Sequence, residues 1–352
     1  MPKTDRNVHI DIIKGIAIVL GPPLTHLRGF DTLFDERLRD VLWTFIPGNF
    51  FIIGGYIIYK SVQRYSLRQW ISSKFKNLII PFYSFLIVYA LLSPVYISLA
   101  NLMGVEPLYK GLGFLQSILR FFLANATLPE ESHFLWFFPA YFIANILFFV
   151  LIKNIRSDLL RLIGIICAPM AGVIMSDIFG HYYIPWMFDT ALVMLPFMFF
   201  GAFFSRYQAQ VEKFLYKYKS MSVLFSAAIF VFLWKTTHYM TWIVFFVIHN
   251  YFEFYVKGVL GFLFLYLLAI SIESYSHSLK KIFVLCGKYA MAIYTMHMII
   301  LDFGWIMRKY YYLLTERVSL FSIFLLSVLV PICLSKYILS KNSFLRKCFL
   351  GI

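Results

Sequence analysis

Residues 9–27 read HIDIIKGIAIVLGPPLTHL, an apolar run that carries Asp11, Lys14 and His26. A run of this length can cross a bilayer as one α-helix, because a spanning helix needs about 20 mostly apolar residues. An ionisable side chain in such a helix is costly, so it usually faces a partner, a water-filled cavity or a substrate. The stretch therefore predicts both a first membrane span and one part of a functional site.

The rest of the chain has the same membrane character. Of its 352 residues, 61% are hydrophobic and only 14% are charged. About ten windows have the length of a membrane helix, and none shows the period-two alternation of a barrel strand. We expect an all-α polytopic membrane helix bundle that forms a single domain over 1–352, with no appended soluble domain. The expected spans are 9–27, 41–59, 78–100, 134–152, 158–176, 187–205, 220–236, 257–273, 281–301 and 319–339.

The formal net charge of +15 reflects membrane topology better than nucleic-acid binding, because the basic residues lie in short connections between apolar runs. Cytoplasmic connections of membrane proteins are enriched in lysine and arginine, which also meet anionic lipids. The connection 60–76 carries five bases and no acid, and the tail after 339 is also basic. We therefore expect both termini to be cytoplasmic, with 238–256 lying on the outer side as an interfacial or re-entrant segment.

The four cysteines, Cys167, Cys286, Cys333 and Cys348, are widely spaced and form no CxxC pair. This pattern predicts neither a disulfide framework nor a metal site. The first apolar run carries Asp11 and Lys14 and is followed by no small-residue cleavage site, so we expect a permanent first helix rather than a signal peptide.

The three ionisable residues of the first run each allow two interpretations. Asp11 and Lys14 are three residues apart, so they can neutralise each other on one helix face, or Lys14 can bind a phosphate. His26 can cap the span at the interface or act in catalysis. Pro22 and Pro23 remove backbone donors, so we expect a kink or an early helix end near Gly21.

Two later segments bring more polar groups into the apolar sequence. His133 and Trp136 lie where the loop 101–133 meets the next span, and this pattern is typical of either a polar cavity mouth or an interfacial aromatic belt. His297 lies well inside a predicted span, with Tyr294 three residues before it. At that spacing the two side chains share a helix face that can point into the bundle.

Several segments, in this order, resemble the membrane-bound acyltransferase family 3, whose members O-acetylate bacterial cell-surface sugars. The resemblance covers most of the chain and rests on six segments: IDIIKGIAIVL with a following histidine, NFFIIGGYI, a basic run ending at Pro81, FLWFFPAYF, LPFMFFGAFF and GKYAMAIYTMH. The order and spacing of the segments together carry the resemblance.

The resemblance implies an acyltransferase of the bacterial inner membrane. Cytoplasmic acetyl-CoA would be the acyl donor, with no permanently bound cofactor, and a surface polysaccharide or its lipid-linked precursor would be the acceptor. His26 takes the role of the essential base or acyl carrier, and Lys14 that of the basic residue near the donor phosphates. Lys74 and Lys76 are further candidates for binding the donor. The residues expected to line the substrate site are Asp11, His133, Trp136, Tyr294 and His297.

The chain departs from the family pattern at three points. Eleven residues separate Lys14 from His26, whereas ten are usual in the family, so Thr25 falls at the expected position. One extra residue rotates a helical side chain by about 100° unless the break at Pro22 absorbs it. Glycine also replaces the usual serine of the second segment at Gly54 or Gly55, and His133 lies one place further from Trp136 than is usual.

The residues taken alone leave a second function open. Asp11, Lys14 and His297 are also the kind of intramembrane groups that form a proton or substrate pathway in a transporter. A multi-span transporter or flippase for a lipid-linked sugar or an acyl intermediate is therefore the alternative hypothesis to an O-acyltransferase.

Overall fold

The computed structural model of this chain describes residues 7–27, 29, 34, 36–105, 123, 133–181, 184–238, 248–308 and 315–351. Within these ranges the chain is helical and contains no strand. The α-helices are α1 Val8–Leu20, α2 Pro22–Thr25, α4 Glu36–Ser61, α5 Leu67–Lys74, α6 Ile80–Leu102, α8 Phe137–Asn154, α9 Asp158–Phe179, α10 Phe188–Lys217, α11 Lys219–Thr236, α12 Tyr251–Tyr275, α13 His277–Lys288, α14 Ala290–Arg308, α15 Glu316–Leu334 and α16 Ser343–Leu345.

Short 3₁₀ and π-helical turns continue or join several of these helices. They are η1 Val62–Arg64, η2 Phe75–Ile79, η3 His133–Trp136, η5 Pro185–Met187, η7 Ser335–Leu339 and η8 Arg346–Leu350. Helix α6, for example, begins in the π-helical turn η2, which itself continues α5.

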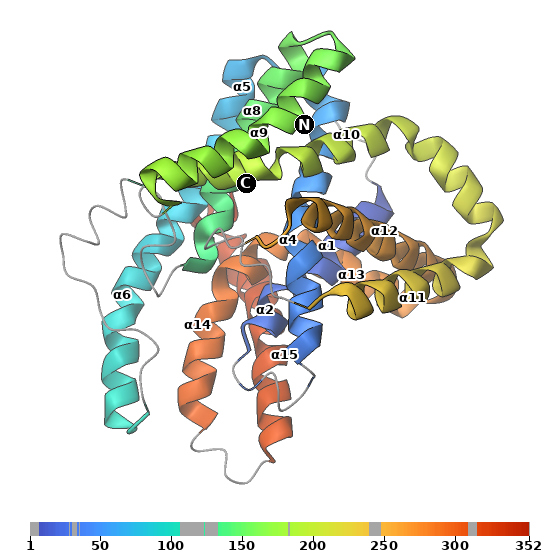
Figure 1. The fold of residues 1–352 in the computed structure, drawn as a ribbon. Helices are drawn as coiled ribbons and strands as arrows, with labels where there is room; N and C mark the ends of the chain where they lie inside the picture. The colour runs from blue at the N-terminus through green and yellow to red at the C-terminus, as the bar shows by residue number, and fades with distance from the viewer. Residues whose placement is uncertain are drawn as a thin grey trace.

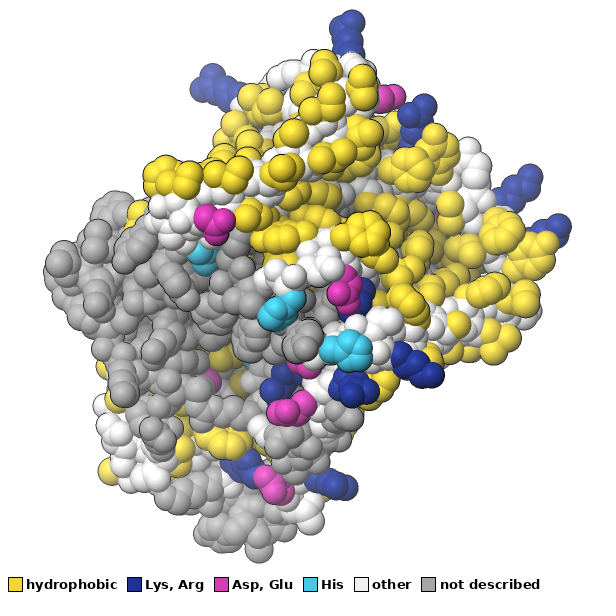
Figure 2. Space-filling model, in the orientation of Figure 1, with side chains coloured by type: hydrophobic (Ala, Val, Ile, Leu, Met, Phe, Trp, Pro, Cys, Tyr) yellow, Lys and Arg dark blue, Asp and Glu magenta, His cyan; other side chains and the backbone are white. Residues whose placement is uncertain are grey.

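Nine helices or helix pairs of the described residues are long and apolar enough to cross a membrane, and Ser220–Thr236 forms a shorter apolar helix. The prediction of an all-α polytopic bundle is confirmed. In Figure 1, α6, α14 and α15 run roughly parallel in the lower half of the view, whereas α11 and α12 lie to their right and run in a different direction. In Figure 2, hydrophobic side chains cover most of the upper and right-hand described part of the face, as expected for a surface that meets lipid. Lysine and arginine side chains lie at its upper and right edges, and further charged and histidine side chains gather near the middle of the view.

Three predicted spans have bounds that differ from the structure by more than five residues. The predicted span 187–205 continues as α10 to Lys217, into the stretch expected to be a connection. The predicted span 281–301 is divided, because α13 ends at Lys288 and α14 starts at Ala290. The predicted span 257–273 begins earlier, at Tyr251, because the Asn250 side chain accepts a hydrogen bond from the Glu253 backbone and caps α12. Residues 251–256, predicted to be interfacial or re-entrant, therefore belong to α12, and 239–247 lie outside the described residues.

Helix α1 packs tightly against α13 through two glycines. A Cβ atom on Gly15 would lie 1.9 Å from the carbonyl oxygen of Phe283, and one on Gly287 would lie 2.1 Å from that of Asp11. Only glycine allows two backbones to approach this closely. Helix α13 therefore ends one residue after Gly287, the glycine that contacts α1.

The N-terminus, the basic connection after α4 and the C-terminus lie at one end of the bundle. The Asn7 side chain is 3.5 Å from the hydroxyl of Tyr56, near the end of α4. At the C-terminus, Gly351 packs against the backbone of Asn77, and the ring centroids of Phe349 and Phe85 are 5.2 Å apart. Both chain ends appear in the upper half of Figure 1.

Candidate active site

Helix α1 ends at Leu20, two residues before Pro22, and the chain turns at Gly21 into the short helix α2. Gly21 has ψ −113°, outside the helical region, and Pro22 and Pro23 then start α2. The predicted kink near Gly21 is therefore confirmed. The hydroxyl of Thr25 donates to the Gly21 carbonyl at 2.8 Å, and His26 forms the C-cap of α2.

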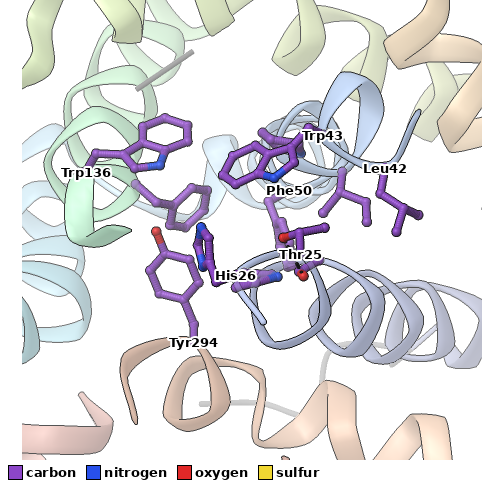
Figure 3. Close-up of a pocket in the computed structure, with 12 residues that line it drawn as sticks. Thr25, His26, Leu42, Trp43, Phe50, Trp136 and Tyr294 are labelled. Atoms are coloured by element: carbon purple, nitrogen blue, oxygen red, sulfur yellow. Dashed lines mark hydrogen bonds between the residues drawn. The ribbon is translucent and has the colours of Figure 1, made fainter. Parts of the chain in front are cut away.

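A cavity with about 430 Å³ of empty space, part of it open to solvent, lies beside this break. Its walls come from Gly21, α2 and its C-cap, and from α4, η3, α8 and α14, which are far apart in the sequence. They are mostly aromatic and aliphatic, and Figure 3 shows His26 and Tyr294 near the centre with Trp43 and Trp136 above them. The lining residues are Gly21, Pro22, Thr25, His26, Leu42, Trp43, Ile46, Pro47, Phe50, Trp136, Phe137 and Tyr294.

His26 is joined to His297, which is fully buried in α14. The Nδ1 atom of His26 lies 2.9 Å from Nε2 of His297, and the two rings are stacked with their centroids 5.2 Å apart. On the other side of its ring, Nδ1 of His297 lies 2.7 Å from the backbone carbonyl oxygen of Tyr294. The two histidines therefore form a chain that ends on a main-chain carbonyl.

This chain determines which histidine nitrogen carries a proton. A carbonyl oxygen only accepts hydrogen bonds, so Nδ1 of His297 is the donor to Tyr294. In a neutral His297 the Nε2 atom is then an acceptor, and Nδ1 of His26 must donate to it. A neutral His26 consequently has its lone pair on Nε2, and this nitrogen is the one that can accept a proton.

Trp136 and Tyr294, which the sequence singles out, do lie in the cavity wall with His26. The ring of Tyr294 packs edge-on against that of Phe137, with the two centroids 5.6 Å apart. The structure also adds Trp43, whose ring centroid is 5.3 Å from that of His26. Trp43 escaped the sequence analysis because one tryptophan in an apolar span looks like an ordinary membrane-facing residue.

Asp11 and Lys14 lie on α1, on the N-terminal side of the break. Lys14 Nζ is 2.8 Å from a carboxylate oxygen of Asp11. The Asp11 side chain is 6% exposed and that of Lys14 is 27% exposed, so the pair has one buried and one accessible member. Neither residue is among the described residues that line the cavity of His26, so the structure does not bring this predicted pair to the cavity.

Lys74 and Lys76 lie elsewhere, at the junction of α5 and η2. Lys74 Nζ is 4.5 Å from the centre of the Trp70 ring, a cation–π contact. Lys76 is exposed and lines an open groove with Arg68. These elements pack on α6, α8 and the C-terminal turn η8, whereas α1 packs on α12 and α13. The two lysines therefore have different neighbours from Lys14.

His133 begins the 3₁₀ turn η3, which ends at Trp136. Its side chain lies outside the described part of the structure, so its predicted place at the mouth of the site stays a prediction. Trp136, the last residue of η3, and Phe137, the first residue of α8, both line the cavity.

The arrangement of this site can now be compared with known proteins. A family model described as an acyltransferase domain, that of membrane-bound acyltransferase family 3, matches residues 7–336. The chain belongs to this family. No curated protein and no solved structure matches it.

Membership of acyltransferase family 3 confirms the resemblance and makes the chain a membrane acyltransferase. The matched region includes the apolar run 9–27 and helix α14. The hydrogen-bonded histidines His26 and His297 therefore both lie within it. The match favours the acyltransferase hypothesis over the transporter or flippase alternative.

Proposed function

We propose that the chain is an O-acetyltransferase of the bacterial inner membrane, which moves an acetyl group from cytoplasmic acetyl-CoA to a hydroxyl of a surface glycan or its lipid-linked precursor. The family supports acyl transfer. The observation that carries the proposal is the chain from His26 through His297 to the Tyr294 carbonyl at an aromatic cavity. Such a chain supplies a base for a hydroxyl, which is the group that an O-acyltransferase must activate.

In the proposed reaction, Nε2 of His26 takes the proton of the acceptor hydroxyl while its oxygen attacks the thioester carbonyl carbon. The new C–O bond forms, the C–S bond breaks, and the leaving sulfur takes the proton back from the His26 imidazolium. The products are the acetyl ester and free CoA thiol, so atoms and charge balance. His297 keeps the reactive tautomer by accepting from Nδ1 of His26.

Donors on the cavity wall can stabilise the negative charge that develops on the thioester oxygen. The Trp136 indole N–H and the Tyr294 hydroxyl are the donors that we assign to this role, because both residues line the cavity with His26. Fixed donors in a mostly apolar site stabilise such charge more than water does, because they need no reorganisation during the reaction.

The donor side is assigned to the end of the bundle that holds the N-terminus, the connection 60–76 and the C-terminus. These three segments lie together. The connection 60–76 and the C-terminal tail are rich in lysine and arginine, and Lys3 and Arg6 precede Asn7 in the sequence. By the positive-inside rule this end is cytoplasmic, so both termini are cytoplasmic. Lys14 is then the accessible ammonium on α1 for the CoA phosphates, with Asp11 holding it in place.

The experiment that tests this function supplies labelled acetyl-CoA to membranes that contain the full chain and to membranes that contain His26→Ala. We expect alkali-labile label in the glycan fraction with the wild type and none with the variant. Equal labelling in both would remove His26 from the reaction, and no labelling in either would contradict the donor.

A vesicle assay separates the proposal from the transporter alternative. Vesicles with the purified chain receive a lipid-linked sugar, with and without acetyl-CoA. Movement of the sugar at an equal rate without acetyl-CoA would favour a transporter.

A further inference from the structure

The last part of the described chain folds back onto the junction of η2 and α6. Residues 343–351, which we call the C-terminal segment, comprise α16, η8 and Gly351. The turn η8 contacts α6, η2 and α14. The family model ends at residue 336, so the match does not include this segment. The acyl-transfer chemistry at the histidine chain makes no use of it.

The side chain of Asn77 joins the C-terminal segment to η2. Two main-chain carbonyl oxygens, those of Ser73 and Gly351, face its amide, and a carbonyl oxygen only accepts hydrogen bonds. The amide nitrogen is therefore the atom that faces them. It donates to the Ser73 carbonyl at 3.1 Å and to the Gly351 carbonyl at 2.7 Å. One side chain thus connects α5, η2 and the C-terminal segment.

The same contact requires glycine at position 351. Gly351 has a φ of 64°, in the left-handed region that residues with a Cβ atom adopt only at a cost. A Cβ atom there would also lie 2.7 Å from both the Cα atom and the carbonyl oxygen of Asn77. Two residues earlier, Phe349 packs edge-on against Phe85 of α6, with the ring centroids 5.2 Å apart. The segment is therefore anchored at two points, on η2 and on α6.

The shape of η2 determines the direction of Lys76, the residue before Asn77. A π-helical turn closes its hydrogen bonds over one more residue than an α-helical turn does. One residue rotates a helical side chain by about 100°. Lys76 would therefore point in another direction relative to α6 if η2 changed into an ordinary α-helical turn. Contacts that hold η2 in its π-helical form also set the direction of this lysine.

The docked segment brings positive charge from two parts of the chain to one end of the bundle. Lys76 of η2 is exposed, and so are Arg346 and Lys347 of η8. CoA carries several phosphate groups, which lysine and arginine bind through charge-assisted hydrogen bonds. The charge at this end therefore fits the anionic part of the acyl donor.

We infer that Asn77 is a positioning residue for the acyl donor. The C-terminal segment, docked through the contact of Asn77 with Gly351, holds η2 in the form that presents Lys76 to the donor phosphates. When the segment undocks, η2 relaxes and the donor binds less tightly, whereas the histidine chain keeps its geometry. The inference rests on the proposed function, because it takes acetyl-CoA as the ligand of Lys76.

The kinetic test compares the purified full chain in liposomes with Asn77→Ala and Gly351→Ala. The glycine variant leaves every amide and every cation in place but prevents the close approach, so it keeps the test valid even if Asn77→Ala does not fold. We expect each variant to raise the KM for acetyl-CoA by about tenfold, a usual size for coupling between sites, with kcat unchanged. Asn154→Ala, an exposed asparagine at the end of α8, is the matched control and should keep the wild-type KM. A wild-type KM in both contact variants, or a loss of kcat alone, would overturn the inference.

A double variant shows whether the contact acts through Lys76. Lys76→Gln removes the charge and should itself raise the KM for acetyl-CoA. If the contact serves to position this lysine, Gly351→Ala should add nothing to the KM of Lys76→Gln, because residues that act through one another are not additive. A full additional increase in the double variant would mean that the segment has a general structural role and would contradict the inference.

The natural Cys348 of η8 reports docking without catalysis, because it is half-buried. In a variant that keeps Cys348 as its only cysteine, a thiol reagent should label the purified protein about tenfold more slowly with saturating acetyl-CoA, since coupling between two sites is reciprocal. Gly351→Ala should raise the labelling rate without acetyl-CoA and should abolish the protection.

Transfer and labelling together distinguish this inference from the proposed function. A wild type that transfers acetyl groups but shows no protection of Cys348 would disprove the inference and leave the function in place. Protection without transfer would support the donor site and contradict the proposed reaction. Absence of both would contradict both proposals.

Discussion

The imidazole rings of His26 and His297 lie nearly parallel, at 15° to each other, although 271 residues separate them in the sequence. The first ring caps a four-residue helix that follows a proline break, and the second is buried in α14. Contact between them therefore depends on the packing of α14 against α2 and on the direction in which the break turns the chain.

Replacement of His297 by leucine should reduce kcat by about 10- to 100-fold, by analogy with the outer-shell partners that orient metal-bound histidines. Leucine cannot accept the proton of His26 Nδ1, so the reactive tautomer is no longer held. Glutamine can both accept and donate, so His297→Gln should restore part of the activity. The measurement is kcat and KM for acetyl-CoA, with Met298→Leu as the control for packing in α14. Equal effects of the leucine and glutamine variants would point to packing alone.

The neighbouring residues Thr25 and His26 should respond very differently to substitution. His26→Ala removes the base, and we expect a loss of about 10²- to 10⁴-fold in kcat. Thr25→Val removes a hydroxyl that is bonded to the Gly21 carbonyl, so we expect close to wild-type activity. The initial rate of acetyl-CoA-dependent glycan labelling distinguishes them. A larger loss in the threonine variant would mean that the functional residue is Thr25, at the usual family spacing, and that the break at Gly21 does not bring His26 into that role.

Lys14→Ala should raise the KM for acetyl-CoA with little change in kcat, because the lysine is assigned to the donor phosphates and lies outside the cavity. Lys14→Arg keeps the charge, so it should bind the donor better than the alanine variant does. Lys281→Ala, an exposed lysine on α13, is the matched control for loss of one positive charge. If Lys14→Ala has the same KM as the control, Lys14 does not bind the donor and serves only in its ion pair with Asp11.

Gly15→Ala should destabilise the protein by about 1–3 kcal/mol, the usual cost of overpacking. The new methyl group would meet the Phe283 carbonyl oxygen at 1.9 Å, and a backbone atom cannot move aside as a side chain does. Gly164→Ala is the control, because its new methyl group meets only the Leu151 side chain at 3.4 Å. The control should melt at the wild-type temperature or slightly above it, whereas a stable Gly15→Ala variant would contradict the close contact of α1 and α13.

Both chain ends should be labelled from the same side of the membrane. A single cysteine introduced at position 7 and the natural Cys348 can be tested one at a time in a background without the other cysteines. In intact cells an impermeant thiol reagent should label neither, and both should react after the membrane is opened. Labelling of one position alone in intact cells would contradict the shared cytoplasmic end.

The helices could be predicted from the sequence because each depends on a local apolar run. Helix ends were less predictable where contacts between helices decide them. The apolar run 281–301 gives no sign of the break at Tyr289, because that break follows the contact of Gly287 with the Asp11 backbone. The start of α12 at Tyr251 depends on the Asn250 cap, which polar residues nearby in the sequence obscure.

The candidate site was predictable only as separate residues. His26, Trp136, Tyr294 and His297 stand out because they are polar or aromatic groups at unusual places in apolar runs. Their order in the site was not predictable, since the contact of His26 with His297 is long-range.

The group at the end of the histidine chain is the main-chain oxygen of Tyr294, and every amino acid has such an oxygen. A complete set of substitutions at position 294 would therefore test the phenol ring and its hydroxyl, but would leave the acceptor of His297 in place. Deep mutational scanning is blind to this member of the site. Only replacement of the peptide bond itself, for example by an ester made through chemical synthesis, would weaken that acceptor and measure its part in the reaction.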